Sequence, residues 1–203
     1  ITTDSLGNIL VTGFFSETAD FYPSAGTTDL TSNGEEDILV ANYAFSGALN
    51  WAFNVGSQDS DFGTAISTDS NDNVLVAGSH NDSPDFFPQT PRVTGLTNYS
   101  LLQAANLIGS RIFGVSYISS TELRGAFSIS IGGHDSNQNE GPDLNQPEAG
   151  RDLAVDSDDN MLLTGFFTST RVFDPLHQEI ILEPNGGSDI FVGSYVMHRQ
   201  SSQ

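Results

Sequence analysis

Side chains that carry oxygen stand at alternate positions in two short polar stretches of the chain. These positions are Asp156, Asp158 and Asn160 in one stretch and Asp69, Asn71 and Asn73 in the other. The spacing resembles the opening of a calcium loop of the DxDxN type, and Ca²⁺ takes six to eight oxygen ligands. These residues are therefore the candidate metal ligands, and Ca²⁺ is the candidate cofactor.

The same spacing also suits a hairpin turn without metal. Asp and Asn side chains accept hydrogen bonds from nearby backbone N–H groups in turns. No Glu follows at the spacing of a complete EF-hand, and a third stretch from Asp4 to Asn8 has Leu6 in its middle. We favour the turn and keep calcium as the alternative.

No arrangement of residues predicts catalysis. The four histidines are scattered, and the sequence has no HExxH, GxSxG or phosphate-loop pattern. Asp and Glu are so frequent that a carboxylate pair for glycoside hydrolysis could be chosen anywhere, and the sequence does not give the separation such a pair needs. We predict no catalytic and no cofactor-binding residue, and we favour a protein that is not an enzyme.

Three copies of one segment organise the chain, at residues 1–23, 65–88 and 154–175. In each copy an alternating segment enters a polar turn that runs from Asp to Asn, and an apolar run closed by glycine follows. This pattern predicts a β-hairpin. Gly7 can supply a positive φ in the first turn. Phenylalanines recur with the copies, and we expect them to pack between repeats.

Further strands are predicted between the copies. Residues 27–34 are expected to form a turn-rich connection, followed by a strand over 37–43, a turn at Ser46-Gly47 and a partner strand over 48–56. Residues 112–117 match 38–43, and Ala126-Phe127 match Ala52-Phe53. We group residues 37–43, 48–55, 63–69 and 73–78 as the four strands of one unit, which is typical of a propeller blade.

The predicted fold is all-β, with about three repeats of four-stranded antiparallel β-propeller blades that belong to a larger ring. We treat residues 1–203 as a single repeat region with units of approximately 1–36, 37–110, 111–188 and a partial 189–203. The second unit is lengthened by insertions around 101–111 and 134–150. Such loops often line a binding face, although a surface loop without a role is the simpler interpretation.

Composition limits the partners. The chain has 26 Asp and Glu against 6 basic residues, all arginine, for a formal charge of −20. That charge argues against nucleic acid and against an anionic membrane surface. No apolar run is long enough to span a bilayer, and there is no cysteine. The chain begins at Ile1 inside a repeat, so we expect a mature product or a fragment.

The repeats resemble the SBBP-type β-propeller family of large secreted bacterial proteins. The resemblance rests on GFFSETADFYPSAG, DLTSNGEEDILV, GALNWAFNVGS, AISTDSNDNVLVAG, AVDSDDNMLLTGFF and GGSDIFVGSY. It implies an extracellular or bacterial cell-surface location and a binding or scaffolding role. The sequence departs from the family where Tyr22 and Phe87 replace the second Asp of a DFDP step, and where Gly125 stands opposite Trp51 of unit one.

The first functional hypothesis is a non-catalytic extracellular binding or adhesion scaffold with Ca²⁺ as a stabilising ion. Its partners would be a protein or glycan ligand at the cell surface and remaining blades from the same or another chain, without membrane insertion. One alternative is a propeller-type glycoside hydrolase or polysaccharide lyase. The other is a structural subunit of a surface layer or filament.

Overall fold

The fold is all-β. The computed structural model describes residues 1–22, 26–81, 111–119, 122–131, 149–168, 170–173 and 180–196, and every regular element in these ranges is a strand. Most of the predicted insertions, residues 101–110 of 101–111 and residues 134–148 of 134–150, lie outside the described residues. None of the described elements is a helix long and apolar enough to cross a membrane.

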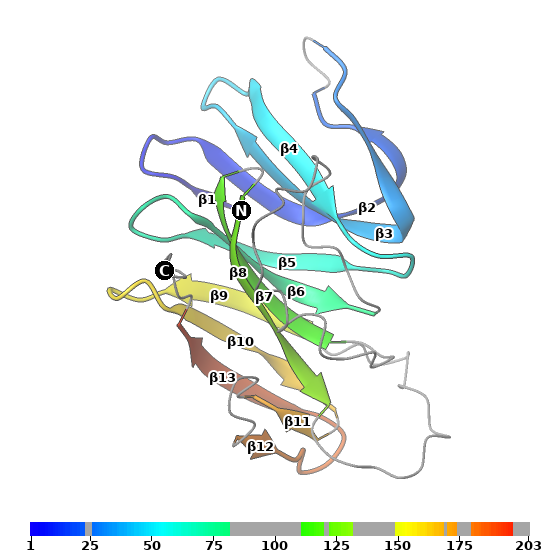
Figure 1. The fold of residues 1–203 in the computed structure, drawn as a ribbon, viewed down its shortest axis with the longest axis vertical. Coiled ribbons are helices and arrows are strands. Elements are labelled where there is room, and N and C mark those ends of the chain that lie inside the picture. The colour runs from blue at the N-terminus through cyan, green and yellow to red at the C-terminus, as the bar shows by residue number, and fades with distance from the viewer. Residues whose placement is uncertain are drawn as a thin grey trace, which may run out of the picture.

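The strands form three antiparallel sheets, which we call blades one, two and three. Blade one pairs β1 (Thr2–Thr3), β2 (Ile9–Asp20), β3 (Asp29–Tyr43) and β4 (Leu49–Val55) in that order. Blade two pairs β5 (Phe62–Thr68), β6 (Val74–His80), β7 (Arg111–Ser119) and β8 (Glu122–Ile131), extended by β11 (Arg171–Val172) and β12 (Ile181–Leu182). Blade three pairs β9 (Ala149–Val155), β10 (Met161–Phe167) and β13 (Asp189–Tyr195). The blades follow one another along the long axis of the molecule (Figure 1).

The predicted hairpins are confirmed. Strands β1 and β2, β5 and β6, and β9 and β10 pair across the three turns that run from Asp to Asn. Strands β3 and β4 pair across the Ser46-Gly47 turn, where Gly47 has a φ of 85°. The match between units also holds in register, because Val115 pairs with Ala126 as Ala41 pairs with Ala52.

The prediction for residues 27–34 was wrong. Strand β3 begins at Asp29, and its first residues continue the ladder with β2 as far as the Asp20–Asp29 pair. The polar Thr, Ser and Asn residues that suggested turns instead form an exposed two-stranded ribbon, in which Thr18 Oγ1 and Thr31 Oγ1 lie 2.9 Å apart. A register shift near Glu17, with a φ of 59°, separates this ribbon from the rest of the sheet.

The grouping of strands within one unit was also wrong. Strands β4 and β5 lie in different sheets, and the hairpin of β5 and β6 pairs instead with β7, which follows it. The polar linker at residues 56–61 therefore carries the chain from blade one to blade two. Each blade starts with a repeated hairpin rather than ending with one.

Two apolar cores lie between the blades. The first combines Leu10, Ile38, Val40, Phe53 and Val55 of blade one with Ile66, Val74, Val76, Phe113, Val115 and Tyr117 of blade two, and Trp51 packs at its edge. The second combines Ala65, Leu75, Ala77 and Ile112 of blade two with Leu153, Met161, Leu163, Phe167 and Phe191 of blade three, together with Phe173. Burying one large apolar side chain contributes about 1.5–3 kcal/mol, so these interfaces hold the blades together.

Aromatic pairs cross the first interface, as the recurring phenylalanines predicted. The ring centroids of Phe14 and Phe62 are 4.8 Å apart with the rings nearly perpendicular, and those of Phe53 and Tyr117 are 5.1 Å apart. Such edge-to-face pairs stabilise beyond their buried area.

Candidate functional site

The predicted ligand stretch of blade three forms a closed turn. Asp156 Oδ1 accepts hydrogen bonds from the backbone N–H groups of Asp158 and Asn160, both at 2.9 Å. Asp156 Oδ2 accepts one from Asn160 Nδ2 at 2.8 Å. The side-chain and backbone hydrogen bonds from Asn160 hold the pKa of Asp156 below its ordinary value of 3.8. This carboxylate therefore organises the turn.

The other two turns have the same contacts. Asp69 binds the backbone N–H groups of Asn71 and Asn73 and the Asn73 side chain, and Asp4 makes the equivalent set although Leu6 stands in the middle. Within the described ranges, no group of three or more His, Cys, Asp and Glu side chains is placed to hold one ion. Calcium at these turns stays a prediction that no contact here tests.

Two carboxylates that the sequence did not single out connect the turns of neighbouring blades. Asp72 accepts hydrogen bonds from Ser5 N at 2.8 Å and Ser5 Oγ at 2.5 Å. Asp159 accepts the same pair from Ser70, at 2.8 and 2.7 Å. We call this contact the turn latch: the second residue of one turn donates to the fourth residue of the next. The latch brings the two predicted ligand stretches side by side.

The fourth turn position has a left-handed backbone. Asp72 and Asp159 have φ values of 58° and 62°, and the equivalent residue of blade one is Gly7, with a φ of 79°. Gly and Asp are among the residues that tolerate this conformation. The sequence feature that could have indicated the left-handed backbone of Asp72 and Asp159 is therefore their alignment with a glycine in the first turn.

We expect Asp72→Gly to lower the free energy of unfolding by about 1 kcal/mol, since it keeps the positive φ and removes only the exposed acceptor. The measurement is a double-mutant cycle with Ser5→Ala in urea unfolding. Ser157→Ala is the control, because this serine is the equivalent residue of blade three and is exposed. Additive losses from Asp72→Gly and Ser5→Ala would contradict the latch.

The latch has a direction. Blade one has Gly7 at the acceptor position and so presents no carboxylate toward a blade before it. Blade three presents Ser157, whose side chain is exposed, toward a blade after it. A further blade with Asp at its fourth turn position would continue the series of latches.

The face of blade three that points away from blade two is apolar and exposed. Ile190 and Val192 of β13 are 81% and 79% exposed. Their equivalents on β3, Ile38 and Val40, are 0% exposed because blade two covers them. Ile112 of β7, the equivalent residue of blade two, is also 0% exposed, because it packs in the core with blade three. We call Leu162, Thr164, Ile190 and Val192 the open face.

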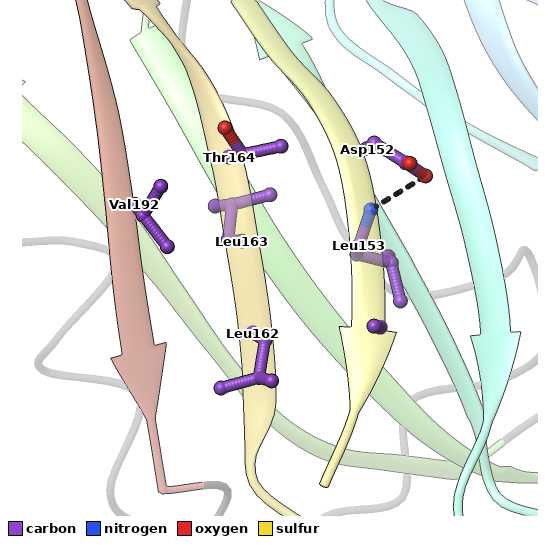
Figure 2. Close-up of a pocket in the computed structure, with 7 residues that line it drawn as sticks. Asp152, Leu153, Leu162, Leu163, Thr164 and Val192 are labelled. Carbon is purple, nitrogen blue, oxygen red and sulfur yellow. Dashed lines mark hydrogen bonds between the residues drawn. The ribbon is translucent and has the colours of Figure 1, made fainter.

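A hollow of about 300 Å³ lies on the open face. Figure 2 shows Val192 on β13, Leu162 and Thr164 on β10, and Asp152 on β9, drawn along three neighbouring strands. Asp152 Oδ1 accepts a hydrogen bond from Leu153 N at 3.0 Å at one side of the hollow. The hollow is wide and mostly apolar, so it suits a packed protein surface better than an enclosed small molecule.

Glycines let successive blades approach closely. Gly63 and Gly150 occupy equivalent positions in β5 and β9, and a Cβ on Gly150 would lie 3.3 Å from Ile112 Cγ2. A Cβ on Gly63 would lie 2.9 Å from Ile38 Cγ2. Ile190 is the third member of the isoleucine series, and its exposure shows where an equivalent glycine of a further blade would approach.

One pair of buried carboxylates lies where the linker from β4 to β5 meets β3. Asp37 and Asp61 are both 0% exposed. Burial, together with the negative charge of Asp37, raises the pKa of Asp61 to about 7, although hydrogen bonds from Ser57 oppose the shift. A general acid needs such a pKa, but a fully buried carboxyl cannot reach a substrate. This pair therefore gives no support to glycoside chemistry.

No family model matches the chain. Over 97 residues the chain is 33% identical to an uncharacterized WD repeat-containing protein of Acanthamoeba polyphaga mimivirus. The match covers 41% of this chain and 7% of that protein, so the chain spans a small part of its relative. WD repeats form four-stranded propeller blades. The similarity therefore agrees with the antiparallel blades, and the protein is an all-β repeat protein of the propeller type.

Proposed function

We propose that the chain is a non-catalytic interaction scaffold built of propeller-type repeats, and that its open face receives a further blade. The observation that carries this proposal is the contrast between Val192, 79% exposed, and Val40, 0% exposed, at equivalent positions. Exposed apolar surface of this kind marks protein interaction sites. Propellers of the WD type commonly bind proteins, which supports a protein rather than a small molecule as the partner.

The partner's chemistry follows from the two existing interfaces. It is a β-blade with apolar residues on its inner strands, a glycine opposite Ile190 and an Asp at the fourth turn position opposite Ser157. Blade one of a second copy has the apolar residues, but it carries Gly7 at the turn, and residues 1–203 hold no equivalent of Gly63 in that blade. A second copy would therefore bind more weakly than a blade with a complete latch.

This difference gives a direct test by sedimentation of the purified chain over a range of concentrations. We expect the wild type to associate weakly, head to tail. Gly7→Asp should associate more tightly, because it supplies the missing acceptor. The double variant Gly7→Asp with Ser157→Ala should associate as weakly as the wild type, because the donor is then absent. Val192→Asp should abolish the association, because it places a charge in the apolar contact.

Phe45→Asp is the matched control, since Phe45 is 88% exposed on the turn between β3 and β4, away from the open face. It should associate like the wild type. If Gly7→Asp and Val192→Asp sediment alike at every concentration, the open face does not receive a blade and the proposal is wrong.

The finer features of the proposal rest on the sequence. The resemblance to the SBBP-type family and the acidic, lysine-free composition support an extracellular or bacterial cell-surface scaffold with a protein or glycan ligand. A structural subunit of a surface layer or filament is a second candidate, because head-to-tail contacts that do not close into a ring generate filaments. Sedimentation separates the two: a filament subunit grows without limit, whereas a ring stops at one size.

A further inference from the structure

A concentration of negative charge surrounds the linker that joins blades one and two. Ser60 Oγ lies 2.8 Å from Glu35 Oε2 and 2.5 Å from Glu36 Oε2. Asp61 N donates to the Glu36 carbonyl at 2.7 Å, which holds the linker against β3. Both arginines whose side chains the structure describes, Arg151 and Arg171, lie on β9 and β11, outside blade one.

Asp37 and Asp61 stand at the centre of this region, and each uses only one of its two oxygens. Asp37 Oδ2 accepts hydrogen bonds from Asn33 Nδ2 at 2.9 Å and Asn54 Nδ2 at 2.6 Å. Asp61 Oδ2 accepts from Ser57 N at 2.6 Å and Ser57 Oγ at 2.8 Å. These donors fix the orientation of both carboxylates.

The other oxygen of each carboxylate accepts no hydrogen bond of ordinary geometry, and the backbone of Asn81 makes only a weak contact with Asp61. Asp37 Oδ1 and Asp61 Oδ1 are buried without a hydrogen bond, on residues that are 0% exposed. An unpaired buried charge is strongly unfavourable. Asp61 N donates to the carbonyl of Glu36, the residue before Asp37 in β3, so both carboxylates lie where the linker meets this strand. Gly56 has no side chain, and a Cβ there would contact Asp37 Oδ1.

We propose that Asp37 and Asp61 bind one divalent cation, Ca²⁺, between blade one and the linker to blade two. A hard cation prefers carboxylate and carbonyl oxygens and accepts water for the remaining positions. It would satisfy both unpartnered oxygens and would tie the linker to β3. This site is distinct from the hairpin turns, where the first carboxylate already accepts hydrogen bonds through both oxygens.

The test is calorimetric titration of the chelator-treated chain with CaCl₂ at pH 6, 7 and 8. We expect binding that tightens as the pH rises, because Ca²⁺ must displace the proton that Asp61 holds near neutral pH. Asp61→Asn should weaken the affinity at least tenfold and remove this pH dependence. Calcium should also raise the melting temperature of the wild type and not that of Asp61→Asn.

Two control variants separate this site from other calcium binding. Asp59→Asn removes an equal charge from an exposed position on the same linker, and Asp156→Asn removes the carboxylate of a candidate turn ligand. Both should keep the pH-dependent site. If Asp61→Asn binds Ca²⁺ like the wild type, or if the wild type shows no calcium heat at millimolar concentration, Asp37 and Asp61 do not bind Ca²⁺. Either result overturns the proposal without affecting the open face.

Discussion

Val40→Asp is expected to lower the free energy of unfolding by about 4 kcal/mol, whereas Val192→Asp should change it by less than about 0.5 kcal/mol. The two valines occupy equivalent positions on β3 and β13, so the substitution, the position within the strand and the added charge are the same. Only their surroundings differ: Val40 is 0% exposed in the core between blades one and two, and Val192 is 79% exposed.

Urea unfolding followed by Trp51 fluorescence measures both variants, because Trp51 is the only tryptophan and packs at the edge of the first core. The total stability of a domain is commonly 5–15 kcal/mol, so Val40→Asp should leave the chain close to unfolding. A similar loss for both variants would mean that other residues of this chain cover the open face, and the proposed function would lose its main support.

Local patterns in the sequence were sufficient to predict the hairpins. The turn from Asp69 to Asn73 encodes its own geometry, because Asp69 binds the N–H groups of residues two and four positions later. The same applies to the strands on either side of Gly47. These contacts depend on neighbours in the chain, so residue type and spacing determine them.

The grouping of strands into blades depends on pairings that leave no local pattern. Strand β6 pairs with β7, although the 30 residues at positions 81–110 separate them in the chain. The ribbon of Thr18 and Thr31 is similar: its polar residues resemble a loop, and only the partner strand makes them a ladder. The sequence therefore predicted most of the strands, missed the first part of β3 and joined β4 to β5 incorrectly.

The sequence did not indicate the buried carboxylate pair, because the chemistry of a carboxylate depends on its surroundings. The alternation of Asp156, Asp158 and Asn160 serves a calcium loop and a hairpin turn equally, and the difference lies in the direction of the backbone N–H groups. Asp61 is a polar residue of the linker, and neither its type nor its spacing indicates burial. It is buried because the linker folds back against β3, a contact that no spacing in the sequence indicates.

In the absence of divalent metal, the stability of the wild-type chain should fall as the pH rises from about 4 to 7, and Asp61→Asn should lack that part of the fall. Burial, followed by the charge of Asp37, raises the pKa of Asp61 from the ordinary 3.8 to about 7. The folded chain therefore keeps a proton that the unfolded chain has lost in this range, so folding becomes less favourable with increasing pH. Three pKa units at about 1.4 kcal/mol each correspond to roughly 4 kcal/mol, which is lost in full above pH 7.

The measurement is urea unfolding in the presence of chelator at pH 4.5, 5.5, 6.5 and 7.5. The difference in unfolding free energy between Asp61→Asn and the wild type at each pH tests the prediction. The neighbouring titratable groups, Asp37 and Glu36 on β3, are present in both proteins, and an Asn at position 61 keeps an acceptor for Ser57. The stability of Asp61→Asn relative to the wild type should therefore increase steadily with pH, while Asp59→Asn should show a nearly constant difference. A constant difference for Asp61→Asn as well would mean that Asp61 ionises at an ordinary pH and that its surroundings are wet, which would also remove the reason for a cation beside it.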